Sequence, residues 1–156
     1  MGTTYRVTTS RHDSGGAISV VDSVAPAGFG PPRHIHGAED EVLFVLTGRI
    51  RWWLAGKTGF CGPGESVFIP RGVEHTWQAI GDVPCRHLVI VTPGGLEEFF
   101  LEMAAADYRI PEDMGAVGES AARHHLTFTG PPLVDADFRS AATGMPAPRK
   151  PAEAVL

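Results

Sequence analysis

Short apolar runs, broken by glycine and proline, constrain the fold of this chain more than any other feature of its sequence. The runs are rich in β-branched and aromatic side chains and recur roughly every eight to twelve residues, which is typical of a β-sandwich or β-barrel. The 19 glycines and 13 prolines supply the turns. We therefore predict an all-β fold. Strands are expected at residues 4–9, 17–24, 41–46, 49–54, 66–70, 75–80 and 86–92, with turns near 55–59 and 61–65.

After the last predicted strand, the apolar spacing changes to that of a helix. Leu96, Phe99, Phe100 and Met103 recur at helical intervals, which predicts one amphipathic helix docked on the barrel wall. Residues 118–125 allow a second short helix before a short strand, so one or two short C-terminal helices are expected.

The length of the chain, 156 residues, suits a single domain. We place this domain at residues 1–140. The segment 141–156 is rich in proline and alanine and poor in large apolar side chains, which is the composition of a tail that cannot build its own core.

The charge of the chain limits the classes of partner. The net charge of −5 and the absence of a lysine and arginine cluster argue against nucleic acid and an anionic membrane, because both need a basic face. A small uncharged or aromatic molecule fits better. No apolar run approaches the roughly 20 residues that span a bilayer, and MGTTYR contains no signal core, so we predict a cytoplasmic protein. Cys61 and Cys85 are expected to be reduced and packed, with a disulfide between them as the alternative.

Three histidines and one glutamate are spaced so that they can meet inside the barrel. His34 and His36 are two residues apart, which places both rings on one face of a strand. The turn after His36 resets the register, so Glu41 can join them, and the hairpin before His75 can return the chain to the same face. His34, His36, Glu41 and His75 are the predicted metal ligands.

Three imidazoles and a carboxylate form a borderline nitrogen and oxygen donor set. This set suits one divalent transition metal ion, Fe, Mn, Co, Ni, Cu or Zn, and suits Ca or Mg poorly. The sequence does not select among these ions. An octahedral ion held by four protein ligands keeps open positions, as catalytic metals do.

The full spacing of these residues resembles the two signature motifs of the cupin superfamily. The first motif runs from Gly28 through the ligands to Gly48 as G-x5-H-x-H-x4-E-x6-G, and the second runs from Gly64 to His75 as G-x5-P-x-G-x2-H. The usual asparagine that ends the second motif is Ala79 in this chain, which puts side-chain support of one strand in doubt. The resemblance implies a small jelly-roll β-barrel with a metal ion near its centre.

Longer phrases, among them EDEVLFVLTG and VTPGGLEEFF, look like those of single-domain bacterial relatives of quercetin 2,3-dioxygenase. This resemblance implies a metal-dependent dioxygenase acting on a flavonol-like or other aromatic or enolic small molecule, with dioxygen as co-substrate. It also gives Glu41 a catalytic role as acceptor of a substrate proton, beside the simpler role of ligand. A non-oxidative isomerase, cyclase or lyase, and a non-catalytic small-molecule-binding cupin, are the alternatives.

One further residue has a predicted functional role, and several others have a structural one. Trp77 shares a face with His75 and is the predicted substrate-binding residue, since its ring can stack on a planar molecule. His87 is expected at the surface or hydrogen-bonded, and Glu39 and Asp40 are expected to be solvated turn acids. The pair His124 and His125 suits a solvated helix end.

Two further expectations concern packing. Phe44, Trp52, Trp53, Phe60 and Phe68 are expected in the core or between the sheets. A homodimer is expected through edge strands or the Pro-rich ends, because open sheet edges pair readily.

Overall fold

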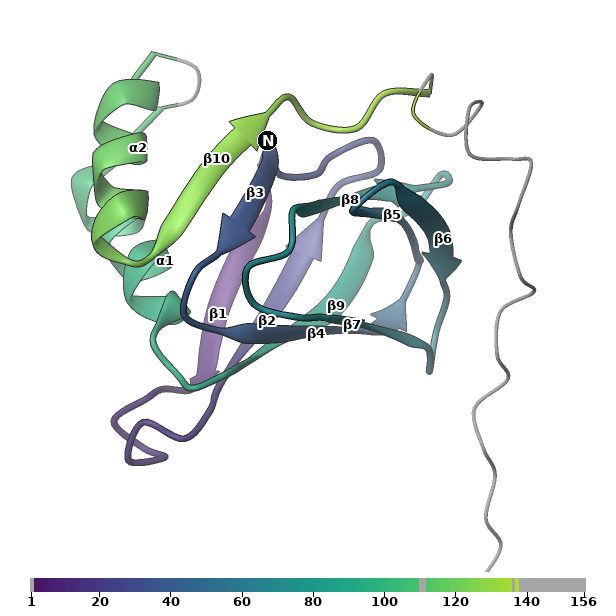
Figure 1. Ribbon diagram of the computed structural model, residues 1–156. Helices are drawn as coiled ribbons and strands as arrows, with labels where there is room; N and C mark the ends of the chain where they lie inside the picture. Colours follow the sequence, from purple (N-terminus) through teal and green to yellow (C-terminus); the bar gives the residue numbers. More distant parts are fainter. Residues whose placement is uncertain (1, 110–111, 136, 138–156) are drawn as a thin grey trace, which may run out of the picture.

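The computed structural model describes residues 2–109, 112–135 and 137, which contain ten strands and two helices (Figure 1). The strands are β1 (Thr4–Thr9), β2 (Ser19–Ala25), β3 (Arg33–His36), β4 (Asp40–Thr47), β5 (Arg49–Leu54), β6 (Lys57–Cys61), β7 (Ser66–Ile69), β8 (His75–Ile80), β9 (Cys85–Thr92) and β10 (Leu126–Gly130). The helices are α1 (Leu96–Ala106) and α2 (Met114–Arg123). The predicted tail at 141–156 lies outside the described residues, and the domain boundary at 140 stays a prediction.

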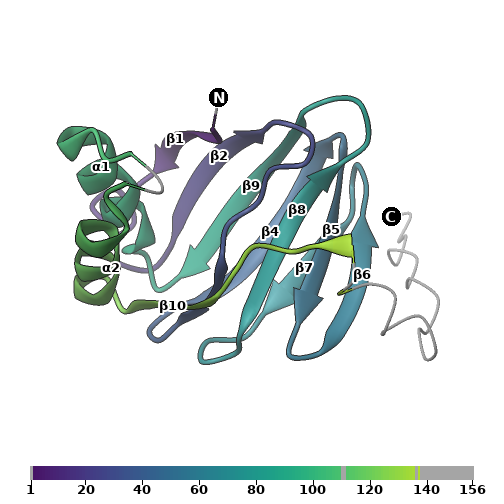
Figure 2. The ribbon, with the colours of Figure 1, turned by 90° about the horizontal axis from the view of Figure 1, so that it is seen from above.

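The strands form two five-stranded antiparallel sheets that face each other (Figure 2). One sheet has the order β1-β2-β9-β4-β7, and the other has the order β10-β3-β8-β5-β6. The helices lie at one end of the sheet pair, beside β1 and β10. The predicted all-β jelly-roll, with one or two short C-terminal helices, is therefore confirmed, and the described residues contain two helices.

Strand alternation places the core between the sheets. In β4, Glu41, Leu43 and Val45 are buried while the residues between them are less so, because side chains of a strand point to opposite faces in turn. Both buried cysteines, Cys61 and Cys85, carry free thiols, as predicted.

The segment around Lys57 differs from the prediction, which made it part of a turn. The turn contains only Ala55 and Gly56, both with positive φ, and β6 begins directly after it. This two-residue hairpin matches the twist of its strands. Gly59 lies opposite Trp52, and a β-carbon there would collide with the indole ring. The strand therefore depends on cross-strand packing rather than on its own propensity.

Two of the aromatic residues expected in the core are instead exposed. Phe60 is 41% exposed and Phe68 is 57% exposed, because both fall on the outward parity of their strands. Phe44, Trp52 and Trp53 are partly buried.

No helix among the described residues is long and apolar enough to cross a membrane. The cytoplasmic location stays a prediction.

Candidate metal centre

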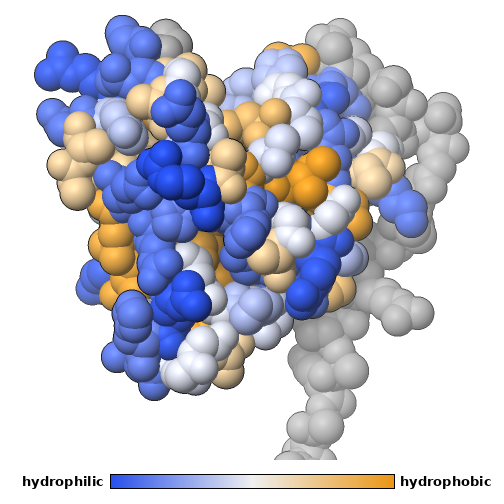
Figure 3. Space-filling model, turned by 60° about the vertical axis from the view of Figure 1, so that its left-hand side comes forward, coloured by the Kyte–Doolittle hydropathy of each residue, from blue (hydrophilic) through white to orange (hydrophobic). Residues whose placement is uncertain are grey.

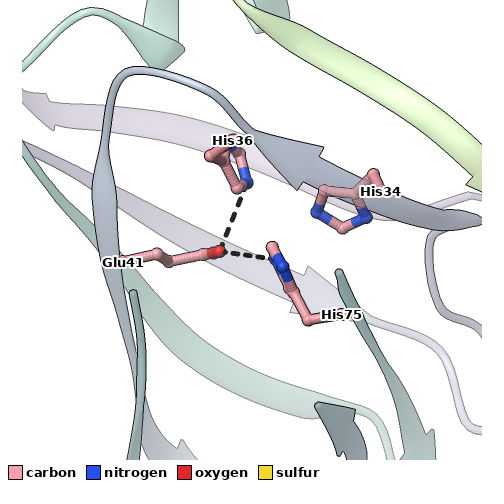
Figure 4. Close-up of side chains that lie close together, drawn as sticks. All are labelled: His34, His36, Glu41 and His75. Carbon is pink, nitrogen blue, oxygen red and sulfur yellow. Dashed lines mark hydrogen bonds and ion pairs between the residues drawn. The ribbon is translucent and has the colours of Figure 1, made fainter. Parts of the chain in front are cut away.

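The four side chains predicted as ligands come together between the two sheets (Figure 4). His34, His36, Glu41 and His75 are all buried, and their candidate ligand atoms lie within 4.8 Å of one another. Oε2 of Glu41 lies 3.0 Å from Nε2 of His75 and 3.3 Å from Nε2 of His36. The ring centroids of His34 and His75 are 4.2 Å apart.

Sheet pairing and one tight turn bring these residues together. His34 and His36 occupy alternate positions of β3, and His34 lies opposite His75 of the neighbouring β8. Gly72, with a φ of 76°, makes the turn before β8, and its N–H donates to the carbonyl oxygen of His36 over 2.7 Å. Glu41 reaches the same space from the other sheet. As predicted, the turn after His36 changes the strand register: β3 ends at His36, and β4 begins at Asp40 in the other sheet.

Burial and mutual contact set the charges of the cluster. Burial, with His75 and His36 nearby, lowers the pKa of His34 to about 3, so this imidazole is neutral at neutral pH. Burial alone would raise the pKa of Glu41, but hydrogen bonds from His36 and His75 hold it well below its usual range. Burial opposes the charged form of His75, yet the Glu41 carboxylate raises its pKa overall.

Two of the three histidines are oriented by backbone carbonyl groups. Nδ1 of His34 donates to the carbonyl oxygen of Pro32 over 2.7 Å, and Nδ1 of His75 donates to that of Val73 over 2.9 Å. Each ring therefore directs its Nε2 toward the cluster, and the proton held on Nδ1 leaves Nε2 free to bind a metal ion once His75 gives up the proton that it shares with Glu41.

Glu39 and Asp40, the two acids where the turn meets β4, differ in their exposure to solvent. Glu39 was predicted to be a solvated turn acid, and this is wrong: it is 5% exposed, and burial raises its pKa. The turn folds inward, so its carboxylate lies near Nδ1 of His36, at 4.0 Å. Asp40 is partly exposed and bonds Arg71.

A cavity of about 770 Å³ extends from the cluster to the helices. Its walls include His34, His36 and Glu41, and also Trp77, as predicted from the parity of β8. A substrate contact for Trp77 stays a prediction. Six further aromatic side chains line the cavity: Tyr5, Phe29, Phe99, Phe100, Tyr108 and Phe128. On the side that carries the helices, hydrophobic surface appears in patches among hydrophilic side chains (Figure 3).

Most of this wall could not be predicted from the sequence. The helical spacing of Phe99, Phe100 and Met103 predicts a face that packs on the barrel, and the structure confirms that this face points inward. The same face also lines the cavity. Tyr5 gave no signal, because its stacking on Phe100, with ring centroids 4.2 Å apart, joins segments far apart in the sequence.

His87 does not lie at the surface, contrary to the prediction. It is fully buried, and neither ring nitrogen has a hydrogen-bond partner of normal geometry among the described residues. Burial lowers its pKa to about 4. Its ring packs edge-on against that of Trp77, with the ring centroids 4.5 Å apart. In β9 the odd-numbered residues, including His87, point toward the core. The sequence alone does not show which face of this strand points inward.

Two remaining residues have structural roles. His124 bonds Glu102 over 2.8 Å and so links α2 to α1, rather than being fully solvated, while His125 is exposed. Ala79, in place of the usual asparagine, leaves its strand supported by two backbone hydrogen bonds of 2.8 Å, with Gly28 and Phe29.

The donor set fits a transition metal ion. Three imidazoles and one carboxylate lie buried within mutual reach, and together they offer the nitrogen and oxygen donors that a divalent transition metal ion takes. The cluster could therefore hold one divalent ion, and its donor types favour the series from Mn to Zn over Ca or Mg.

Comparison with known proteins points to one family. The family model of the cupin domain matches residues 20–91. The chain is 24% identical over 96 residues to a quercetin 2,3-dioxygenase from Bacillus subtilis, a match that covers 62% of this chain. The match spans only 28% of that relative.

Solved structures resemble the fold. A cupin-like protein from Thermotoga maritima superposes with a TM-score of 0.61 at 18% identity, over 93% of this chain and 89% of the other. A protein described as a predicted oxalate decarboxylase from the same organism gives 0.56 at 18% identity, over 58% and 80%. KdgF from Halomonas sp. gives 0.54 at 17% identity, over 59% and 81%. At such identities, the likeness concerns the fold alone.

Proposed function

We propose that this chain, which belongs to the cupin superfamily, is a metal-dependent dioxygenase that acts on an uncharged aromatic or enolic small molecule. The observation that carries this proposal is the cavity that opens on the His and Glu cluster. Its volume of about 770 Å³ suits a small-molecule substrate. The named relative from B. subtilis supports the same reaction class.

The lining of the cavity favours an uncharged substrate. Apart from the cluster itself, the described lining residues are apolar, aromatic or neutral, with no lysine or arginine among them. A carboxylate beyond the reach of the metal ion, as in a dicarboxylate, would find no cationic side chain to pair with, which is costly in a buried site. A planar aromatic molecule would instead pack against Trp77 and the aromatic wall.

The residues of the cluster have distinct roles in this reaction. A bound ion would supply Lewis acidity toward a hydroxyl or enol oxygen and, if redox-active, a route for electrons to dioxygen. His34, His36 and His75 would hold the ion. Glu41 borders the cavity, and its carboxylate would accept a proton from the substrate hydroxyl. The aromatic wall excludes water while the substrate is bound.

The experiment begins with elemental analysis of protein purified without added metal. Protein loaded with each of the candidate ions is then given a panel of flavonols and enols in an oxygen electrode. We expect oxygen uptake matched to substrate loss, and no turnover under anaerobic conditions. Turnover that continues without oxygen would contradict the proposal.

A non-oxidative isomerase, cyclase or lyase is the second candidate, and Glu41 favours it. Its carboxylate borders the cavity, so it could accept a proton from a substrate and return it whether or not dioxygen takes part. Product formed under argon, without oxygen incorporation, would support this candidate. Tight binding without any product would support a non-catalytic binding protein.

A further inference from the structure

We propose that Glu39 is the positioning residue for His36. Its carboxylate accepts a hydrogen bond from Nδ1 of His36 when Nε2 of the same ring holds the metal ion. The inference rests on the metal site of the proposed function, and it concerns the second layer of that site rather than the ligands.

The first observation is the unequal support of the three histidines. His34 and His75 each donate from Nδ1 to a backbone carbonyl group two residues earlier. Nδ1 of His36 is buried and has no hydrogen-bond partner among the described residues. His36 is thus the ring whose orientation and tautomer the backbone does not fix.

The second observation is an unpaired acceptor facing that nitrogen. Oε2 of Glu39 is buried and also lacks a hydrogen-bond partner in the described part of the chain. It lies 4.0 Å from Nδ1 of His36, and both side chains are almost completely buried. This distance is too long for a hydrogen bond, but a small rotation of the ring or of the carboxylate would close it.

Pairing these two atoms removes two costs at once. A buried donor and a buried acceptor each lose their water without compensation when they remain unpaired. A ring that binds metal through Nε2 carries its proton on Nδ1, which is the donor that Glu39 lacks. Such outer hydrogen bonds fix the orientation of ligand histidines and raise their basicity.

Metal affinity gives the first test. The full-length protein is stripped of metal and titrated with Co²⁺ against a competing chelator. Glu39→Leu should weaken Co²⁺ binding by about 10- to 100-fold, whereas Glu39→Gln, which keeps an acceptor oxygen, should stay within about threefold of the original protein. Equal weakening by both substitutions, or no weakening by either, would overturn the proposal.

The ring nitrogen itself gives the second test. Long-range ¹H–¹⁵N spectra of the Zn²⁺-loaded protein should show a hydrogen-bonded Nδ1 proton on His36 that persists in Glu39→Gln and is lost in Glu39→Leu. An unchanged signal in Glu39→Leu would contradict the proposed contact. If that variant does not fold, Glu39→Ala takes its place in both measurements.

Glu74→Leu is the matched control, because Glu74 precedes His75 but its side chain is partly exposed. It should bind Co²⁺ as the original protein does. The test also separates this inference from the proposed function. If the original protein binds no Co²⁺, the metal site itself is wrong; if it binds and Glu39→Leu binds equally well, only the role of Glu39 is wrong.

A second, independent observation concerns the outer face of the sheet β1-β2-β9-β4-β7, which we infer to be the contact between two copies of this chain. Val20, Ile90, Val42 and Phe68 are paired neighbours across four strands. Leu88 and Phe44 form an adjacent apolar pair. An antiparallel sheet with a solvated face normally carries polar residues there.

The charges around this patch favour a second copy as its occupant. Asp22 pairs with Arg6 and Arg86, and Asp40 pairs with Arg71. The face therefore carries little net charge, although the whole chain has a net charge of −5. Two copies can meet through this face without the electrostatic repulsion that the more acidic parts of the surface would cause. An apolar patch with a charged rim is also the common anatomy of an interface, and a two-fold axis would bring identical patches together.

Sedimentation velocity of the full-length protein tests this contact. The original protein should be a dimer, and Phe68→Asp should convert it to a monomer without loss of Co²⁺ binding. Leu101→Asp is the control, because Leu101 is similarly exposed, at 55%, on α1, and it should remain a dimer. A monomeric original protein, or a dimeric Phe68→Asp, would overturn the inference.

Discussion

Arg71 binds the carboxylate of Asp40 at two points, with its Nε 3.1 Å from Oδ1 and its Nη2 3.0 Å from Oδ2. The backbone N–H of Arg71 adds a third bond to Oδ1, of 2.8 Å. This contact ties the first residue of β4 to the turn before β8. Glu41 follows directly on one side and His75 follows four residues later on the other, so the pair holds two candidate ligands from opposite sheets in register.

Replacing Arg71 should therefore disturb the site more than the fold. We expect Arg71→Met to weaken Co²⁺ binding while the melting temperature of the metal-free protein changes little, since an exposed ion pair contributes little to stability. Chelator competition and a thermal melt measure the two effects. A large loss of melting temperature with unchanged affinity would contradict this role.

Metal should stabilise the folded protein through the buried cluster. Addition of Zn²⁺ at about 100 times its dissociation constant should stabilise the protein by about 2.7 kcal/mol, because the ion binds the folded state preferentially. His34→Ala should greatly reduce the resulting rise in melting temperature. Differential scanning calorimetry with and without metal measures it, and an equal rise in His34→Ala would argue against the site.

His87 should make the protein sensitive to mild acid. Its pKa is lowered from 6.5 to about 4 in the folded state, so between these values the unfolded chain binds a proton that the folded chain does not. Stability from this group is therefore complete above pH 6.5 and is lost as the pH falls toward 4, by about 1.4 kcal/mol per unit at most.

The substitution His87→Phe should remove this pH dependence while preserving much of the packing against Trp77. We expect its free energy of unfolding to fall less steeply than that of the original protein between pH 6.5 and 4. Urea titrations of metal-free protein at several pH values measure the slope. Parallel curves for the two proteins would show that His87 does not cause the loss.

Gly48 should not tolerate a side chain. Its φ is 75°, and a β-carbon there would lie 2.7 Å from the carbonyl oxygen of Pro84. Gly48→Ala combines backbone strain with this collision, so we expect a loss of about 1–3 kcal/mol or more of stability. Gly56→Ala is the control, because its φ is similar but no atom lies within 4 Å of the added carbon. Chemical denaturation should show the smaller loss for Gly56→Ala.

The aromatic wall should determine the affinity for a planar substrate. Phe100 lines the cavity and stacks on Tyr5, so Phe100→Ala should weaken flavonol binding roughly tenfold, the equivalent of about one lost aromatic contact. Leu101→Ala changes the next residue of the helix, which is exposed, and should leave binding unchanged. Absorbance titrations with metal-loaded protein compare the two. Equal affinities would place the substrate elsewhere.

The strands and the cluster could be predicted because they depend on local periodicity and fixed spacing. Alternation within β3 puts His34 and His36 on one face whatever the rest of the chain does, and Gly72 marks the turn that returns the chain to His75. β6 was not predicted, because Gly59 is a poor strand residue. The pairing of Gly59 with β5 depends on the ring of Trp52, which occupies the space that a side chain at this position would need.

By itself, the sequence determined the period of each element, the turns and the identity of the donor atoms, because these follow from neighbours along the chain. Only the tertiary structure decided which face of β9 turns inward, and hence that His87 is buried, and that Glu39 folds back beside His36. It also decided that Tyr5 and Phe100 meet to form one cavity wall. These outcomes depend on register and on contacts between distant segments, and a shift of one residue in a strand would reverse every side chain that it carries.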